Sequence, residues 1–288
     1  MRLGRRGLTA GLAAGASAGA GVLALVAGRP VAPTSLRIGP VSWQVIGPGR
    51  ELGSVRVEAP GEGHWTQAVI LRLDPNRVRL ALSLHLNHEM SAGAWTVEDA
   101  PPASVAAFNA GQFNSIAPWG WTVMNGLELR PPGLGPLSMA VVMDRAGQVR
   151  FVDPDSISAV RAAGGAWTAL QSYPSLLTGR GEIPAAIVAA SSGLDVQHRD
   201  ARLALAEQAD GRLLVLLTRF DGLGEAGGSI PFGLTLNETA QLLRSLGAVR
   251  AVALDGGISA QLMVRAGGRP RTWPGWRRVP LGIIVTTP

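Results

Sequence analysis

The order of apolar and polar positions along the chain predicts mainly β-strands. From Val41 onward, short apolar or alternating segments are separated by Gly, Pro, Asn and Asp, the residues that favour turns. The candidate strands are residues 41–46, 68–73, 78–84, 104–108, 139–143, 148–152, 203–207, 213–218 and 251–254. Three turn sequences predict hairpins: Asp74-Pro75-Asn76 between 68–73 and 78–84, Ala146-Gly147 between 139–143 and 148–152, and Asp210-Gly211 between 203–207 and 213–218.

The clearest helix begins after Thr235. Thr235 is a good N-cap residue, and Glu238 three positions later completes a capping box. The residues that form its apolar face at helical spacing are Leu236, Ala240, Leu243 and Leu246. Gly247 can then adopt the left-handed conformation that ends a helix.

The strand candidates greatly outnumber the helices. They neither alternate regularly with helices nor form a purely antiparallel pattern, so we predict an α+β fold with mixed β-sheets and a few packed helices. Residues 67–288 are expected to form one folded domain, preceded over residues 31–66 by a linker and N-terminal strands. At 288 residues and 47% hydrophobic content, the chain can bury a sizeable core.

Residues 1–30 have the composition of a targeting segment. Arg2, Arg5 and Arg6 precede residues 8–27, an uncharged apolar stretch rich in Ala and Gly. The stretch is long enough to cross a bilayer, so a cleaved signal and an uncleaved membrane anchor both fit it. Either one predicts export, to the periplasm, to the medium or to the outer side of a membrane.

Composition narrows the classes of function. The formal charge is +6, but all 26 basic residues are Arg and are spread along the chain, whereas nucleic-acid binding needs them gathered in a patch. Cysteine is absent, which excludes disulfides, thiolate metal sites and a Cys nucleophile. His85 and His88 have a spacing open to metal binding, but no third ligand is near them in the sequence. We therefore expect neither a metal nor another cofactor.

Three polar residues stand at the ends of apolar strands. Asp255 follows one of them, and the glycines behind it free backbone amides to approach an anion. Asn109 follows another, beside Gly111, and Arg202 opens a third. The turn at Asp255 suits a phosphate, the amide of Asn109 can donate to a sugar hydroxyl or a phosphate oxygen, and the guanidinium of Arg202 can clamp a phosphoryl group. Each residue by itself also fits a turn cap, an Asx turn or a surface cation.

The order of these segments resembles that of the phosphodiester glycosidase family. The segments are NAGQF at 109–113, RDARLALAEQADGRLLVLL at 199–217, GLTLNETAQLLRSLGAVRAVALDGGIS at 233–259 and RRVPLGIIV at 277–285. The similarity runs over residues 69–285. Its most specific part is 235–259, where a capped helix, a buried strand and Asp-Gly-Gly follow one another.

The resemblance implies hydrolysis of the bond between a sugar's anomeric carbon and a phosphodiester, on an exported or envelope glycan. The family's polar positions correspond here to Asn109, Arg202 and Asp255 as catalytic residues, and to Gly111, Thr235, Gly256, Gly257, Ser259 and Arg278 as substrate-binding residues. Two positions depart from the family pattern. Gln112 stands where an aromatic is usual and is expected to alter substrate packing. Ile258 replaces a third glycine and is expected to crowd the turn that receives the phosphate.

A glycosidase normally uses two carboxyl groups, although a phosphate leaving group reduces the need for a strong acid. On this hypothesis Asp255 acts at the anomeric carbon, Arg202 and Arg278 hold the phosphate, and Asn109 orients the sugar. Candidates for a second carboxylate are Asp221 and Glu238, of which Glu238 already has a structural role in the capping box.

Two other classes of function stay open. One is a non-catalytic glycan-binding or envelope-assembly module on the same fold, which the departures at Gln112 and Ile258 favour. The other is a phosphodiesterase that attacks phosphorus, which would usually need a metal cluster.

Overall fold

The structure is a computed structural model that describes residues 36–59, 65–85, 93–114, 117–135, 137–189, 195–220, 230 and 232–288. Val31–Pro288 form one compact unit. The targeting segment predicted over residues 1–30 lies outside the described residues. Among the helices that are described, none has the length and apolar character needed to cross a membrane.

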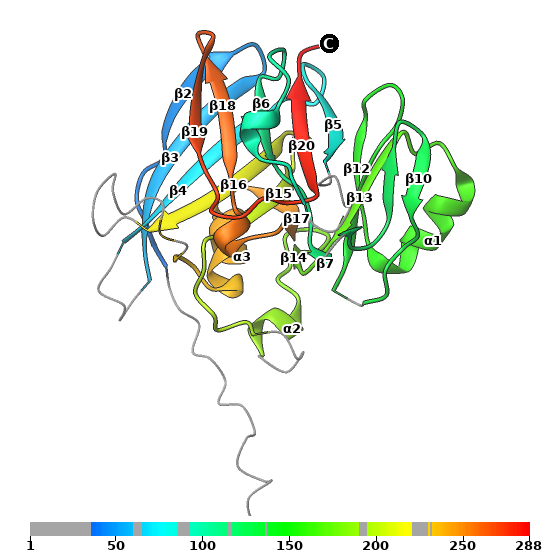
Figure 1. The fold of residues 1–288 in the computed structure, drawn as a ribbon. Helices are drawn as coiled ribbons and strands as arrows, with labels where there is room; N and C mark the ends of the chain where they lie inside the picture. Colours follow the sequence, from blue (N-terminus) through cyan, green and yellow to red (C-terminus); the bar gives the residue numbers. More distant parts are fainter. Residues whose placement is uncertain are drawn as a thin grey trace, which may run out of the picture. The chain divides into compact units, whose positions relative to one another are not determined.

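The main core lies between two β-sheets (Figure 1). The larger sheet has the strand order β1-β3-β4-β16-β15-β17-β14, with β2 pairing on β3; the smaller has the order β19-β18-β6-β20-β5. The strands of the larger sheet are β1 (Arg37–Ile38), β2 (Ser42–Gly47), β3 (Arg50–Glu58), β4 (Trp65–Leu73), β14 (Ser175–Leu177), β15 (Leu203–Gln208), β16 (Leu213–Phe220) and β17 (Ala248–Ala253). Those of the smaller sheet are β5 (Arg79–Leu84), β6 (Ala106–Asn109), β18 (Leu262–Ala266), β19 (Arg269–Trp273) and β20 (Leu281–Thr286). Leu71 and Val215 from one sheet and Phe108 and Ile283 from the other belong to the same buried cluster.

A third sheet has the strand order β10-β9-β13-β11-β12. Its strands are β9 (Thr122–Met124), β10 (Leu127–Arg130), β11 (Met139–Met143), β12 (Val149–Val152) and β13 (Thr168–Ser172), and the short strands β7 (Phe113–Asn114) and β8 (Ala117–Pro118) pair separately. One face buries Met139 and Leu170 in the main core. The other face is covered by α1 (Pro154–Ala163) through Ile157 (Figure 1).

All nine predicted strands are present, with bounds that differ by a few residues, and two of the three predicted hairpins are confirmed. β11 pairs with β12, and β15 pairs with β16, both antiparallel. Gly147 and Gly211 have φ values of +87° and +82° in the intervening turns, a conformation that glycine adopts without steric cost.

The hairpin predicted across Asp74-Pro75-Asn76 is wrong. The turn itself forms, because Asp74 Oδ1 accepts a hydrogen bond of 2.9 Å from the backbone N–H of Asn76. However, β4 pairs with β3 and β16 in the larger sheet, whereas β5 pairs with β20 in the smaller sheet. The turn therefore carries the chain from one sheet to the other, where β4 and β5 pair with the distant strands β16 and β20.

The molecule is mostly β-sheet with few helices, as predicted, but the expectation of mixed sheets is wrong. Every strand pairing within the described residues is antiparallel. The helix α3 (Leu236–Ser245) connects β16 with β17. These two strands run in the same direction, but β15 lies between them and pairs antiparallel with both.

The predicted helix, α3, is confirmed, and so are the residues predicted to begin and end it. Thr235 Oγ1 accepts from the backbone N–H of Glu238 at 3.2 Å, and Glu238 Oε2 accepts from the backbone N–H of Thr235 at 2.9 Å. Gly247 follows the helix with φ +83°. Leu242 and Leu243 of α3 pack in a second core on the outer face of the larger sheet, together with the short helix α2 (Ala185–Val188) through Ile187. Two further single turns, η1 (Val97–Asp99) and η3 (Gly257–Ser259), are 3-10 helices.

Candidate active site

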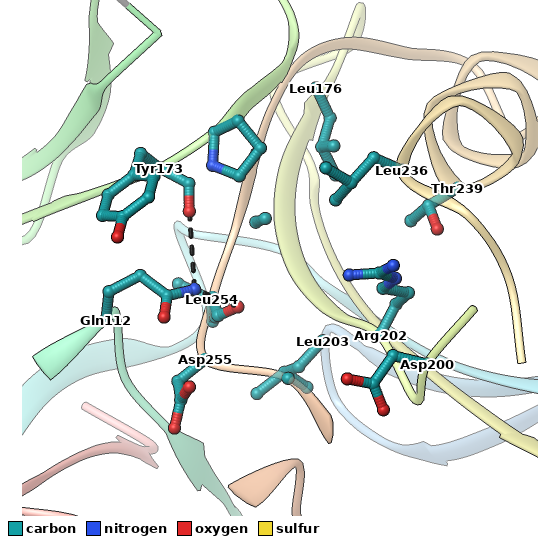
Figure 2. A pocket seen from close by; sticks show the side chains of 13 residues that line it. Gln112, Tyr173, Leu176, Asp200, Arg202, Leu203, Leu236, Thr239, Leu254 and Asp255 are labelled. Atoms are coloured by element: carbon teal, nitrogen blue, oxygen red, sulfur yellow. Dashed lines mark hydrogen bonds between the residues drawn. The ribbon is translucent and has the colours of Figure 1, made fainter. Parts of the chain in front are cut away.

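A cavity of about 250 Å³ opens where the edge of the larger sheet meets the first turn of α3. The residues that line it are Gln112, Tyr173, Pro174, Leu176, Asp200, Arg202, Leu203, Leu236, Thr239, Ala253, Leu254, Asp255 and Gly256. Figure 2 shows Gln112, Tyr173 and Asp255 on one side of this cavity and Asp200, Arg202 and Thr239 on the other. Two of the three residues predicted as catalytic, Arg202 and Asp255, therefore share one cavity.

Asp255 lies directly after β17, and its carboxyl group is largely buried. The pKa of Asp255 is raised to about 6, chiefly by burial and also by the negative charge of Asp200, while hydrogen bonding from Ser259 and the positive charge of Arg277 act in the opposite direction. The Oδ2 atom of Asp255 has no hydrogen-bond partner within the described residues. A buried carboxyl group with a free oxygen and a pKa close to neutrality can exchange protons with a substrate.

Asp200 provides a second carboxyl group in the cavity, and the sequence analysis missed it. Burial raises the pKa of Asp200, while the positive charge of Arg202 and a hydrogen bond from the backbone N–H of Ala201 lower it. Its Oδ2 atom lies 3.6 Å from Nε2 of His198. The signal in the sequence was the same as for Asp255, a carboxylate next to a buried strand, but it stood inside a run of charged residues typical of a surface turn.

The Asp-Gly-Gly turn is shaped to lie against this second carboxylate. Gly257 has φ +59°, and a Cβ at this position would lie 2.7 Å from Asp200 Oδ2. A Cβ on Gly256 would lie 2.7 Å from the carbonyl oxygen of Ala201. Any larger residue would push the two segments apart, so both glycines serve to bring Asp255 close to Asp200.

Arg202 supplies the cation of the cavity. Its Nε donates to the carbonyl of Leu234 at 2.8 Å and its Nη2 donates to the carbonyl of His198, whereas Nη1 makes no hydrogen bond within the described part of the chain. Burial lowers the pKa of Arg202 and the charge of Asp200 raises it. Two backbone carbonyls thus hold the guanidinium in place and leave one of its nitrogens for an anionic ligand.

Asn109 does not line the cavity. It is fully buried at the end of β6, where its Nδ2 donates to the backbone carbonyl of Asp255 at 2.6 Å and its Oδ1 accepts from the backbone N–H of Gln261 at 2.9 Å. The backbone N–H of Asp255 in turn donates to the carbonyl of Ala110 at 3.0 Å. Asn109 therefore holds the turn that carries Asp255, and both ends of its amide are used.

Three other residues predicted to bind substrate have structural contacts. A Cβ on Gly111 would lie 2.9 Å from the side chain of Ser172, so this glycine allows close packing against β13. Thr235 caps α3. Arg278 donates from Nη1 to the carbonyl of Ala94 at 2.8 Å and is exposed. The neighbouring Arg277 is the arginine whose charge acts on Asp255.

The two departures from the family pattern have different outcomes. Gln112 lines the cavity, and its Nε2 donates to the carbonyls of Leu254 at 3.3 Å and Tyr173 at 3.5 Å. Tyr173 in turn packs edge-on against Trp119, with ring centroids 4.7 Å apart. Ile258, which was expected to crowd the turn, is 46% exposed and does not line the cavity.

The remaining candidates do not reach the cavity or cannot be placed. Glu238 is buried, and its carboxylate is held by both Nη atoms of Arg199 at 2.7 Å as well as by the cap of α3. Asp221 and His88 lie outside the described residues. His85 is exposed, and the described part of the chain contains no group of three acidic or histidine residues that could hold a metal ion.

Comparison with protein families gives one match. The sequence model of the phosphodiester glycosidase family matches residues 103–286, which include β6, the cavity and β20. No curated protein matches the chain in sequence.

Several solved structures share the fold. One is the catalytic domain of zebrafish N-acetylglucosamine-1-phosphodiester alpha-N-acetylglucosaminidase, described as auto-inhibited by its pro-peptide: TM-score 0.63, 16% identity, covering 88% of this chain and 88% of that chain. Another is a protein from Synechocystis, with TM-score 0.57 and 17% identity over 87% of this chain and 64% of that chain. A third is described as an exported protein from Burkholderia pseudomallei, with TM-score 0.50 and 16% identity over 77% of this chain and 74% of that chain. At these identities the likeness shows a shared fold.

Proposed function

Because the chain belongs to the phosphodiester glycosidase family, we propose that it hydrolyses the bond between the anomeric carbon of a sugar and a phosphodiester. The observation that carries the proposal is the pair of carboxyl groups, Asp200 and Asp255, that face one cavity together with the guanidinium of Arg202. Burial raises the pKa of both carboxyl groups. Two carboxyl groups can act as the base and the proton donor in the cleavage of a glycosidic bond, and a cation can stabilise the phosphate that departs.

We assign Asp255 the role of general base. A pKa of about 6 leaves the group mostly ionised at neutral pH and still basic enough to accept a proton. Water attacks the anomeric carbon as its proton passes to Asp255, and the bond between that carbon and the phosphate oxygen breaks. Asn109 and Ser259 act on Asp255 and not on the sugar, since one holds its backbone and the other hydrogen-bonds its carboxyl group.

We assign Asp200 and Arg202 the role of assisting the departure of the phosphate. Arg202 stabilises the negative charge of the departing phosphate through the guanidinium nitrogen that has no partner within the described residues. Asp200, whose pKa is raised by burial, gives a proton to the leaving oxygen when that proton is needed. The positive charge of Arg277 acts on Asp255 and favours its ionised form.

Export is part of the proposal. The basic and apolar pattern of residues 1–30 supports it, and an exported enzyme would meet envelope or extracellular glycans. The proposed substrate class is therefore a glycan phosphodiester outside the cytoplasm.

The test is incubation of the full chain with a panel of sugar 1-(methyl phosphate) diesters, including that of N-acetylglucosamine, and measurement of the free sugar. We expect release of sugar by the wild type and a loss of at least about 100-fold in kcat/KM for Asp255→Asn and Asp200→Asn, since acid and base groups contribute that much. Asp155→Asn, at an exposed carboxylate on α1, is the matched control and should stay active.

Reaction in oxygen-18 water identifies the bond that breaks. Label in the sugar supports cleavage at carbon, whereas label in the phosphate would show a phosphodiesterase. Saturable binding of every diester without turnover would contradict the enzyme and support a glycan-binding module.

A further inference from the structure

Two large apolar side chains are exposed next to the active site. Ile258 is 46% exposed and Trp276 is 62% exposed. The segments that carry them are joined, because the backbone N–H of Trp276 donates to the carbonyl of Ile258 at 2.7 Å and that of Arg277 donates to the same carbonyl at 3.0 Å. We call Ile258, Trp276, Arg277 and Phe113 the rim patch.

The rim patch does not line the cavity, but two of its residues lie close in the chain to residues that do. Ile258 belongs to the turn that begins with Asp255 and Gly256, which line the cavity. The guanidinium of Arg277 lies 4.7 Å from the ring centroid of Phe113, which follows the cavity residue Gln112. Because the charge of Arg277 also acts on the carboxyl group of Asp255, a phosphate bound at the mouth of the cavity would meet this patch.

The segment that carries Trp276 is held firmly. Gly275 packs so tightly that a Cβ there would lie 2.9 Å from the carbonyl oxygen of Ser259. Arg219 is 2% exposed and has no carboxylate partner within the described residues. Its Nη2 donates to the carbonyls of Ala260 at 2.6 Å and Pro274 at 2.8 Å. Burying an unpaired cation costs free energy, so this residue stabilises one arrangement of the two segments at the expense of overall stability.

We propose that the rim patch binds an apolar chain carried by the phosphate on its side away from the sugar. This inference rests on the proposed function and names its substrate class: sugar 1-phosphodiesters of a lipid-like alcohol. The aliphatic side chain of Ile258 has no group that could hydrogen-bond a sugar, and the indole of Trp276 extends the apolar surface. Arg277 and the exposed Arg278 place positive charge beside it, which complements a phosphate joined to an apolar chain.

The experiment compares sugar 1-(alkyl phosphate) diesters that carry methyl, butyl and octyl groups, on a sugar that the wild type hydrolyses. In a second arm, calorimetry measures the binding of methyl phosphate and octyl phosphate, which needs no turnover. We expect kcat/KM for the diesters and the affinity for the alkyl phosphates to rise about tenfold from methyl to octyl. This is the gain expected when the patch removes roughly two methylene groups of the alkyl chain from water. Ile258→Ser and Trp276→Ser should each remove most of this gain. Leu127→Ser, at an exposed leucine on β10, should keep it.

The outcomes separate this inference from the proposed function. Hydrolysis of all three diesters at equal rates would overturn the inference and leave the hydrolase in place. Binding of octyl phosphate that depends on Ile258 and Trp276, with no diester hydrolysed, would contradict the hydrolase and support the patch. A wild-type dimer that becomes monomeric in both serine variants would show that a second copy covers the patch, and would overturn the inference.

Discussion

Asp255 is a carboxyl group whose ionised form is poorly solvated in the folded protein. Burial is the main cause of its raised pKa, and Asp200 adds to it by repulsion. Single residues of this kind trade stability for reactivity, because the charge that the chemistry needs is costly to bury. Its neighbours Ser259 and Arg277 reduce the cost without removing it.

This cost predicts that Asp255→Asn stabilises the protein at high pH. The pKa of Asp255 is about 6 in the folded protein and 3.8 ordinarily, so the protonated form favours folding. That stability is fully present below pH 3.8 and is lost as the pH rises through 6. A shift of this size corresponds to at most about 3 kcal/mol, and solvent at the cavity mouth reduces the expected gain of the variant at pH 8 to about 2 kcal/mol.

Urea unfolding of both proteins at pH 8 and pH 4 checks this prediction. The variant should be more stable at pH 8, and the difference should shrink at pH 4. Asp155→Asn is the control and should change the free energy of unfolding by less than about 0.5 kcal/mol. A variant less stable than the wild type at pH 8 would show that the Asp255 carboxylate is well compensated.

At the scale of elements, α3 shows how a local pattern places one wall of the site. Its cap begins at Thr235, its buried leucines pack on the larger sheet, and Leu236 and Thr239 of its first turn line the cavity. The same Glu238 that completes the cap also pairs with Arg199, just before Asp200 and Arg202. The cap therefore connects α3 with the segment that carries two of the proposed active groups.

The cap predicts a difference between two substitutions of Thr235. Thr235→Ala removes the acceptor of the Glu238 N–H and should lower the free energy of unfolding by about 1 kcal/mol. Thr235→Ser keeps the hydroxyl and should retain most of the wild-type stability. Urea unfolding at neutral pH measures both. Equal losses in the two variants would show that the methyl group of Thr235, and not its hydroxyl, stabilises the helix.

At the scale of the whole molecule, the site forms where the two main sheets meet. Asn109 ends β6 in the smaller sheet, and Asp255 follows β17 in the larger one. The hydrogen bond from Asn109 Nδ2 to the carbonyl of Asp255 joins residues 146 positions apart. One buried amide thus sets the position of the proposed base relative to the rest of the fold.

This junction predicts that Asn109→Ala weakens both the fold and the activity. The substitution leaves the buried carbonyl of Asp255 and the N–H of Gln261 without partners, which should cost about 2–4 kcal/mol in the free energy of unfolding. The value of kcat should fall because the turn moves. Asn114→Ala, at an exposed asparagine on β7, is the control for both measurements. A stable Asn109→Ala with reduced activity would instead favour direct contact between Asn109 and the substrate.

The sequence by itself determined the elements whose signals are local. The capping box of α3, the hairpins β11–β12 and β15–β16, and the carboxylate at the end of β17 depend on residues only a few positions apart. Turn geometry and cap chemistry act over that range, so their patterns can be recognised without a fold. The motif order also indicated the family, which the family comparison confirms.

Only the tertiary structure decided which strands are partners and which polar groups share the cavity. The turn after β4 looks the same in sequence whether β5 returns to the same sheet or crosses to the other. Packing between distant segments places Asp200 in the cavity and directs the side chain of Asn109 to the backbone of Asp255. It also brings Arg277, and not Arg278, close enough for its charge to act on Asp255. The role of a polar residue near the cavity depends on whether its side of the strand or turn faces the cavity or the core. Contacts between residues far apart in the sequence decide which side that is.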